Sequence, residues 1–282
     1  MQMNRKISIK CGSNYVLNLG KRTYIMGILN ITPDSFSDGG DFIDVEKAVE
    51  HAKNMVRDGA DIIDVGGEST RPGALEVSAK EELKRILPVV GRLVKEVDVP
   101  VSVDTYKAQV AEEVLKAGAH MINDVWGLQR DRSMAEVIAK HQVPVIIMHN
   151  QKGTEYKNDL VEEIKLFLSK SIQIALAAGI KRKNIIIDPG IGFGKNPEQN
   201  IQVMARLKEL NDLGYPILLG TSRKSMIGKI LDLPPKERVE GTIATTVLGI
   251  VQGVDIVRVH DVKENFRAAR VTDAITRSKQ DG

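Results

Sequence analysis

The sequence predicts an α/β fold, a (β/α)8 TIM barrel that follows a short N-terminal β-hairpin. Three observations lead to this prediction. Eight short runs rich in Val, Ile and Leu recur along the chain, and segments with helical periodicity separate one run from the next. The runs do not alternate between apolar and polar residues, and such near-continuous apolar character is typical of parallel strands buried on both faces. Eight strand–helix units are also the number that closes a barrel.

The strand candidates share a short apolar core that ends in polar residues. They are 23–29, 61–67, 100–105, 120–127, 144–150, 184–190, 216–222 and 255–261. Three of them open with Pro100, Pro144 and Pro216, at the position where a strand loses least from a missing N–H. A doubly wound open sheet is the alternative. It would usually carry a GxGxxG turn after its first strand, and residues 27–40 contain none, so we prefer the barrel.

The segments between the strands carry apolar residues at helical spacing. In 44–60 these residues lie on one face, and Gly59 is a suitable C-terminal cap. Segment 78–97 begins with Ser78 and has Glu81 three residues later, which is a capping box. Pro88 is expected to kink or interrupt this helix. The remaining helix candidates are 107–119, 133–142, 160–180, 197–214, 238–253 and 262–278.

Residues 5–19 predict the hairpin, with a Gly-Ser-Asn turn, and we expect it to cover the bottom of the barrel. The sequence has no internal repeat, low-complexity segment or linker, so residues 1–282 are expected to form a single barrel domain.

The composition narrows the class of protein. Lys and Arg number 40 against 37 Asp and Glu, with no dense basic stripe, so no nucleic-acid partner is expected. Cys11 is the single cysteine, which excludes an internal disulfide and fits a reducing compartment. The first residues lack the apolar region of a secretory signal, and no run approaches a membrane span. We therefore expect a cytoplasmic protein without a membrane partner.

Polar residues collect where the strand candidates end. The first strand is followed by "NITPDSFSDGG" (30–40), which is long for a connecting turn. In a barrel the carboxyl ends of all strands share one face, and that face holds the active site. The loop 30–40 is therefore expected to be a working loop on that face. The other residues at these ends include Arg71, Asp104, Asn123, Asp124, His149, Asp188, Lys224, Arg258 and His260.

These residue types indicate the chemistry of the site. Two buried aspartates with an asparagine suit a planar heterocycle that carries an N–H and an amino group, such as a pterin or guanine, because a carboxylate accepts both hydrogens as a fork. Lys224, Arg258 and His260 suit an anion. No Ser–His–Asp triad, thiol nucleophile or zinc ligand set is evident. Considered one at a time, these residues also fit purely structural roles. Asp124 fits a helix cap, His149 fits a hydrogen-bonded histidine at the rim of the barrel, and Arg71 and Lys224 fit solvated surface charges.

The chain resembles the dihydropteroate synthase family along almost its entire length. The matching segments, in the family's order, are "GILNITPDSFSDGG", "DIIDVGGESTRPG", "SVDT", "IND", "MHN", "DPGIGFGK", "GTSRKS" and "RVHDV". The resemblance implies a (β/α)8 barrel that joins p-aminobenzoate to 6-hydroxymethyl-7,8-dihydropterin diphosphate. The products would be 7,8-dihydropteroate, a folate precursor, and diphosphate.

The resemblance also implies roles for single residues. The pterin site would comprise Asp104, Asn123, Met148, Asp188, Phe193, Lys224 and Arg258, with Arg258 stacked on the ring. The diphosphate would be bound by Asn30, Arg258 and His260, with Asn30 also near Mg²⁺. The p-aminobenzoate site, which sulfonamides occupy in this family, would comprise Phe36, Thr70, Pro72, Lys224 and Ser225. The residues expected to act in catalysis are Asp38, Arg71, Asp104 and Lys224.

The implied mechanism is a dissociative, SN1-like loss of diphosphate from the pterin methylene carbon, followed by attack of the arylamine. Two alternatives share part of the pattern. One is a pterin-binding methyltransferase barrel that delivers methyltetrahydrofolate to a corrinoid protein, which would lack the "TPDSFSDGG" and "SRKS" pair. The other is a silent pterin-binding homologue.

A homodimer formed by the last two helices is also expected, partly because 241–253 is almost free of charge.

Overall fold

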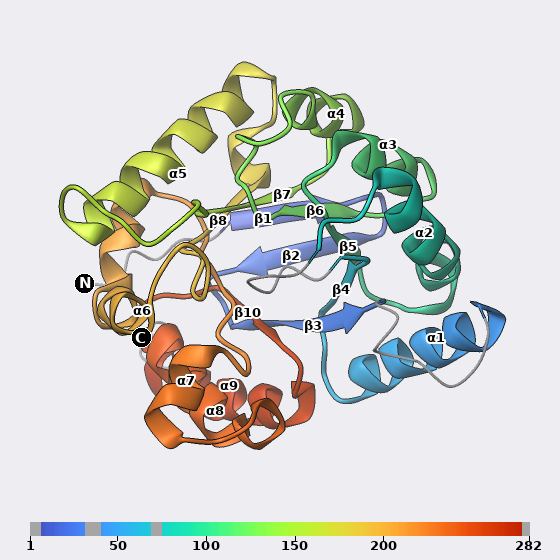
Figure 1. The fold of residues 1–282 in the computed structure, drawn as a ribbon. Coiled ribbons are helices and arrows are strands. Elements are labelled where there is room, and N and C mark those ends of the chain that lie inside the picture. Colours follow the sequence, from blue (N-terminus) through green and yellow to red (C-terminus); the bar gives the residue numbers. More distant parts are fainter. Residues whose placement is uncertain (1–6, 32–40, 69–74, 278–282) are drawn as a thin grey trace.

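The computed structural model describes residues 7–31, 41–68 and 75–277, and at its centre lies a ring of parallel strands (Figure 1). Consecutive strands are hydrogen-bonded from β3 to β8, and β10 lies between β3 and β9. A parallel bridge between Ile187 and Ile217 joins β8 to the segment before β9, so the sheet closes into the predicted barrel. In chain order the strands are β3 (Tyr24–Asn30), β4 (Ile62–Gly66), β5 (Val101–Asp104), β6 (Met121–Asp124), β7 (Val145–Met148), β8 (Ile185–Asp188), β9 (Leu218–Leu219) and β10 (Ile256–Val259).

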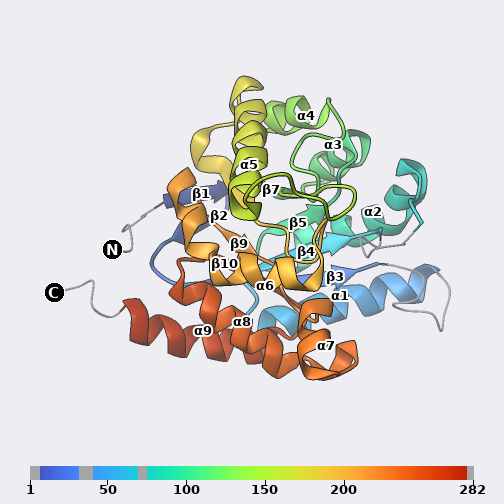
Figure 2. The ribbon, with the colours of Figure 1, turned by 60° about the vertical axis from the view of Figure 1, so that its left-hand side comes forward.

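Helices occupy the connections and surround the strands (Figure 1). They are α1 (Asp41–Arg57), α2 (Ala79–Glu96), α3 (Ala108–Lys116), α4 (Met134–His141), α5 (Leu160–Ala177), α6 (Pro197–Ala205), α7 (Ser225–Leu231), α8 (Val239–Val251) and α9 (Val262–Arg277). Each long helix buries one apolar face against the strands, and in α1 this face includes Ala48, Val49, Ala52 and Met55. Helices α8 and α9 pack side by side on the outside of the barrel (Figure 2). Within the described residues, no helix combines the length and the apolar character that a membrane span needs.

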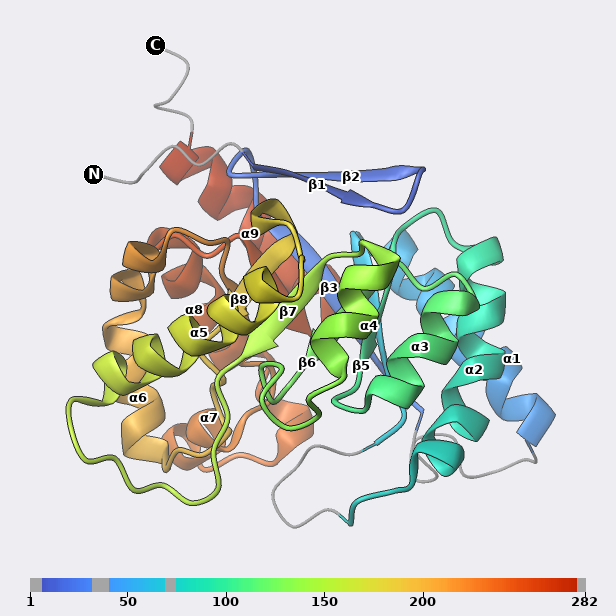
Figure 3. The same cartoon turned by 90° about the horizontal axis from the view of Figure 1, so that it is seen from above.

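The N-terminal hairpin closes one end of the barrel, as the sequence predicted. Strands β1 (Ile7–Cys11) and β2 (Tyr15–Leu19) pair antiparallel, and Figure 3 shows them across the end opposite to α7. Gly12 stands in the turn at φ +68°, a conformation that favours glycine. The hairpin buries Ile9, Cys11, Leu17 and Leu19 against an apolar layer inside the barrel, formed by Tyr24, Met26, Ile62, Met121, Ile146, Ile186, Leu218 and Ile256.

Pro88 does not interrupt its helix, although an interruption was one of the two outcomes expected from the sequence. Helix α2 runs from Ala79 to Glu96 with Pro88 inside it. A proline in a helix costs about 3 kcal/mol. Here Ile86, Val89 and Leu93 are fully buried on both sides of the proline, and burying each such side chain contributes about 1.5–3 kcal/mol. The apolar face therefore outweighs the lost hydrogen bond.

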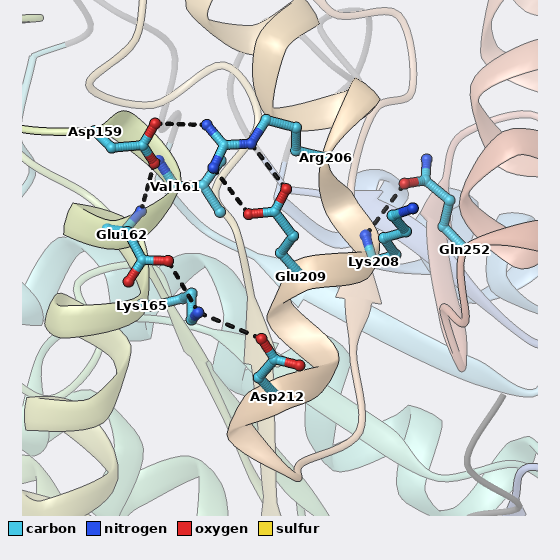
Figure 4. A network of polar contacts seen from close by, with 9 residues as sticks. All are labelled: Asp159, Val161, Glu162, Lys165, Arg206, Lys208, Glu209, Asp212 and Gln252. Atoms are coloured by element: carbon cyan, nitrogen blue, oxygen red, sulfur yellow. Dashed lines mark hydrogen bonds and ion pairs between the residues drawn. The ribbon is translucent and has the colours of Figure 1, made fainter. Parts of the chain in front are cut away.

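The predicted helix 197–214 is divided into two parts. Helix α6 ends at Ala205, and a 3-10 helix, η3 (Leu207–Leu213), follows it. The tighter three-residue period places Leu207 and Leu210 on one side, and both are fully buried. Arg206 stands at the break and donates to Asp159 before α5 (2.6 Å) and to Glu209 (2.9 and 2.8 Å), which fastens this connection to its neighbour (Figure 4).

Candidate active site

The strand register brings the predicted polar residues to one level at the carboxyl ends of the strands. Asn30 on β3 pairs with Gly66, which pairs with Asp104 on β5, and Asp104 pairs with Asn123 on β6. Gly66 leaves room between its neighbours, since a Cβ there would lie 3.7 Å from both the Asn30 Oδ1 and the Asp104 Cβ. Asp188 pairs with Met148 on the opposite side of the barrel. The ring of polar residues expected from the sequence is therefore present.

A buried cluster of one cation and two carboxylates lies in this ring. The Arg258 Nε donates to Asp64 at 2.6 Å, and its Nη2 donates to Asp104 at 2.9 Å. Asp64 is fully buried on β4, and it also accepts from the Asn123 amide at 3.1 Å. Burial raises the pKa of Asp104, and the Arg258 guanidinium counteracts this rise. Asp64 thus fixes two residues of the predicted site, although the sequence analysis did not single it out.

The same cluster leaves buried hydrogen-bond acceptors without a donor. Asp64 Oδ1, Asp104 Oδ1 and Asn123 Oδ1 are buried atoms with no partner in the described part of the chain, as is the Ser102 hydroxyl oxygen. A buried acceptor without a partner costs about 1–3 kcal/mol. Asp64 and Asp104 share Arg258, and Asn123 donates to Asp64, so a bound molecule that donates several N–H groups to this cluster would satisfy its unpaired oxygens.

Asp188 is held by the turn that follows it. Its Oδ1 accepts from the Gly190 N–H at 2.7 Å, and burial raises its pKa to about 6. The turn contains Gly190, Gly192 and Gly194 at positive φ. The glycine at 190 is required by space as well, because a Cβ there would lie 1.9 Å from the His149 carbonyl oxygen.

A buried lysine organises the inside of this turn. The Lys195 Nζ donates to the Gly190 and Phe193 carbonyl oxygens, both at 3.0 Å, and lies 2.8 Å from the His149 Nδ1. Three acceptors match the three donors of the ammonium group. His149 is 2 % exposed, and burial together with Lys195 lowers its pKa to about 2. His149 is therefore a structural residue, and Lys195, which the sequence analysis passed over, supports Phe193.

Lys224 and Phe193 come together at the edge of the ring. The Lys224 Nζ lies 4.1 Å from the centroid of the Phe193 ring, a cation–π contact. Lys224 and Ser225 stand at the start of α7, a seven-residue helix that the sequence analysis did not predict. Phe193 packs on an apolar cluster beside the ring, formed by Tyr106, Val125 and Met148 with Trp126.

His260 follows β10 and lies near the cations Arg223, Arg258 and Lys224. Its Nδ1 lies 2.9 Å from the Ser222 hydroxyl. Burial and the neighbouring Arg223 lower the pKa of His260 to about 3, so the imidazole is neutral near pH 7. Arg223 adopts φ +59° and is fixed in this left-handed conformation by two hydrogen bonds to Asp261.

The remaining predicted residues divide into two groups. Asp124 is structural, since it accepts from the Trp126 and Leu128 N–H groups at 2.8 Å. The loop residues Phe36, Asp38, Thr70, Arg71 and Pro72 lie outside the described residues.

The site can bind a flat donor-bearing ring and an anion side by side. The unpaired acceptors and the Asp188 carboxylate can accept hydrogens from a ring, whereas Arg258, Lys224 and His260 can donate hydrogen bonds to an anion. A barrel with such a site is typical of enzymes that bind a heterocycle at the carboxyl ends of the strands. Comparison with known families defines the class further, because the pterin binding enzyme family matches residues 26–260.

Individual relatives define the family. A curated dihydropteroate synthase from Clostridium beijerinckii is 59 % identical over 270 residues, covering 95 % of this chain and 100 % of that protein. A dihydropteroate synthase from Clostridium difficile, solved in the presence of pteroic acid, is 64 % identical with a TM-score of 0.91, over 93 % of this chain and 99 % of that one. The Xanthomonas albilineans enzyme with 4-aminobenzoic acid is 42 % identical, also with a TM-score of 0.91, over 96 % and 98 %. The chain belongs to the dihydropteroate synthase family.

Proposed function

We propose that this protein condenses 6-hydroxymethyl-7,8-dihydropterin diphosphate with p-aminobenzoate to give 7,8-dihydropteroate and diphosphate. The observation that carries the proposal is the group of buried, unpaired acceptor oxygens on Asp64, Asp104 and Asn123 beside Arg258. The pterin ring offers N–H and amino donors to such acceptors, and Asp188 can accept two of these hydrogens as a fork.

Arg258 would contact both the pterin ring and the diphosphate of the first substrate. Its Nε and Nη2 are engaged by Asp64 and Asp104, and Nη1 makes no hydrogen bond to a described residue. The two carboxylates hold the guanidinium so that its face is available for stacking on the pterin and its free edge for the diphosphate. Asn30 and His260 would complete the diphosphate site.

The second substrate would bind beside Lys224 and Ser225, at the start of α7. Phe36, Thr70 and Pro72 are proposed to complete this p-aminobenzoate site, and sulfonamides would then compete for it. Lys224 can contact the ring substrate on one side and the carboxylate of p-aminobenzoate on the other.

The residues support a reaction without an enzyme nucleophile. The methylene C–O bond breaks, its electron pair leaves with the diphosphate, and the arylamine nitrogen forms the new C–N bond and then loses a proton to solvent. Positive charge on the methylene carbon would be stabilised by Asp104 and by Asp38, and one well-placed contact of this kind is worth about 3–4 kcal/mol. Arg71, in the segment that follows β4 in the chain, is also proposed to act in catalysis.

Mg²⁺ fits the residues that the structure describes. None of them form a group of three or more His, Cys, Asp or Glu side chains that could hold a metal ion. Mg²⁺ is commonly held by one or two protein oxygens together with substrate phosphates, and the Asn30 amide oxygen beside Gly66 can supply one. The ion would neutralise charge on the leaving diphosphate.

Asn30→Ala should raise the Mg²⁺ concentration that gives half-maximal diphosphate release, by about tenfold, because a ligand oxygen is lost. A magnesium titration of the initial rate measures this change. Asn123→Ala is the matched control, since it removes another strand-end amide but should raise the KM for the pterin substrate instead. An unchanged magnesium requirement in Asn30→Ala would remove Asn30 from the metal site.

Asp38→Asn should lower kcat about tenfold or more while pterin affinity stays near that of the wild type. The reason is that its charge is needed mainly when the methylene carbon becomes positive. Single-turnover rates and pterin titrations separate the two effects. Equal rates for Asp38→Asn and wild type would reduce Asp38 to an Asp-Gly turn, which asparagine forms equally well.

A homodimer through α8 and α9 is part of the proposal. Ile250, in the nearly uncharged segment 241–253, is fully buried in the core and does not contribute to the surface. The exposed apolar residues are instead Leu248 (44 %) and Val251 (52 %) on α8 and Val271 (62 %) and Ile275 (69 %) on α9.

A cytoplasmic location is also proposed, and the buried free Cys11 is consistent with a reducing compartment.

Val251→Lys should weaken this dimer about tenfold or more, because a charge would be buried at an apolar contact. Sedimentation at micromolar concentration should give twice the chain mass of 31.0 kDa for the wild type and a shift toward one chain for the variant. Leu166→Lys on α5, 66 % exposed, is the control and should sediment like the wild type. A wild-type mass of one chain would refute the dimer.

A diphosphate-release assay with three arms tests the proposed function. Both substrates together should give sustained release, and omission of p-aminobenzoate should stop it. In the third arm, methyl transfer from methyltetrahydrofolate to a corrinoid acceptor should be absent. Methyl transfer without diphosphate release would support the methyltransferase alternative, and pterin binding without either activity would support a silent homologue.

A further inference from the structure

Ser222 makes two hydrogen bonds to His260, and together they fix where the hydrogens lie. The backbone N–H of His260 donates to the Ser222 Oγ at 3.1 Å, and the same Oγ lies 2.9 Å from the His260 Nδ1. Ser222 is 5 % exposed. A serine hydroxyl has one hydrogen to donate, and within the described residues Nδ1 of His260 is the acceptor in reach of it. Nδ1 therefore carries the lone pair, and the hydrogen of the neutral ring is on Nε2.

The charges around His260 favour the same state. Arg223, Lys224 and Arg258 disfavour a protonated imidazole, and Asp261 acts in the opposite direction. The Asp261 carboxylate is already paired with the Arg223 guanidinium through both of its oxygens. A protonated ring would also leave the buried Ser222 hydroxyl as acceptor of two N–H groups, with its own hydrogen unused.

We propose that Ser222 is a positioning residue that holds His260 as the neutral Nε2–H tautomer. His260 then meets the anion as a directed N–H donor, and Arg258 and Lys224 supply the positive charge. The identity of the anion, the diphosphate of the first substrate, rests on the proposed function, whereas the tautomer does not. The "GTSRKS" segment thereby has a second function: its first serine, Ser222, sets the tautomer of His260, which follows the next strand.

Nitrogen-15 NMR of the full chain tests the tautomer without any ligand. The protein is labelled at its five histidines, and His260 is assigned by the signal that disappears in His260→Gln. The imidazole should show the Nε2–H pattern unchanged from pH 5.5 to 8.5. An imidazolium within that range, or the Nδ1–H pattern, would overturn the proposal.

A pair of variants tests the role of the hydroxyl. Ser222→Ala should give a mixture of tautomers and a histidine that titrates at higher pH, because the bond that favours the neutral ring is lost. Its dissociation constant for inorganic pyrophosphate with Mg²⁺ should rise about three- to tenfold, as expected for one hydrogen bond. Thr221→Val is the matched control: it removes a neighbouring buried hydroxyl that contacts Thr245 at 2.7 Å, and it should keep the wild-type His260 signals.

The outcomes separate this proposal from the proposed function. If wild-type protein shows the Nε2–H tautomer but binds no pyrophosphate, the function fails and the tautomer stands. If Ser222→Ala keeps a pure Nε2–H signal and wild-type affinity, Ser222 has no positioning role. Ser222→Thr keeps the hydroxyl and should restore both readouts, which distinguishes loss of the bond from general damage.

Discussion

Asp188→Ala should abolish measurable pterin binding while the barrel stays folded. Losing one partner of a buried, charged hydrogen bond costs about 2–5 kcal/mol, which corresponds to roughly thirty- to several-thousand-fold in affinity. The cost to stability is smaller, because the structural bond lost is the one from the Gly190 N–H, at about 1–3 kcal/mol. Calorimetric titration with the pterin substrate measures the affinity, and thermal unfolding measures the fold.

Asp124→Ala is the control for this experiment. Asp124 is also a buried aspartate at a strand end, and it accepts two backbone N–H groups. Its loss should destabilise the protein and leave pterin affinity within about threefold of the wild type. Should Asp188→Ala bind pterin as tightly as Asp124→Ala does, Asp188 would not be the ring partner.

The same assignment predicts a pH dependence. Burial raises the pKa of Asp188 to about 6, and only the ionised carboxylate can accept two ring hydrogens. Wild-type pterin affinity should therefore decline as the pH falls through about 6. In Asp188→Asn the affinity should be low throughout and the decline weaker.

Arg258→Met should have the second large effect, on both stability and binding. It removes the cation between Asp64 and Asp104, and breaking a buried ion pair on one side costs about 3–5 kcal/mol because a charge is left unpaired. Diphosphate affinity should fall as well, since Arg258 is its main proposed donor. Urea unfolding gives the stability, and a pyrophosphate titration gives the affinity.

A double variant separates these two effects. Asp64→Asn removes the fully buried charge that Arg258→Met leaves behind, so the double variant should regain about 1–3 kcal/mol of stability over Arg258→Met. It should not regain diphosphate affinity. Strictly additive losses of stability would mean that Asp64 and Arg258 are not coupled, contrary to the 2.6 Å contact.

Much of the fold was predictable because its signals are local. Buried parallel strands must be apolar on both faces, and the apolar runs therefore marked all eight barrel strands. The antiparallel hairpin was marked separately, by its Gly-Ser-Asn turn. The exact course of two helices could not be predicted, because there tertiary packing overrides the local sequence signal. Helix α2 continues through Pro88 because its apolar face is buried, and α6 stops because Leu207 and Leu210 turn into the core.

The same distinction between local and tertiary signals separates the site residues that were predicted from those that were missed. Asp104 and Asp188 end their strands and Asn123 is the last but one residue of β6, and they were predicted because a polar residue is conspicuous at the end of an apolar strand. Asp64 was missed because it lies inside a strand, and its partners Asn123 and Arg258 are 59 and 194 residues away in the chain. Lys195 was missed for a related reason: a lysine beside glycines resembles a surface residue until its three acceptors are seen.

The central claim is that this ring of residues carries out the condensation, and one single-turnover measurement tests it most directly. Excess enzyme is mixed with the pterin diphosphate, p-aminobenzoate and Mg²⁺, and the products are identified by mass spectrometry. The wild type should form 7,8-dihydropteroate and diphosphate in equal amounts. The folded double variant Asp64→Asn/Arg258→Met should form neither at a comparable rate. Undiminished product formation by that variant, or no dihydropteroate from the wild type, would contradict the account.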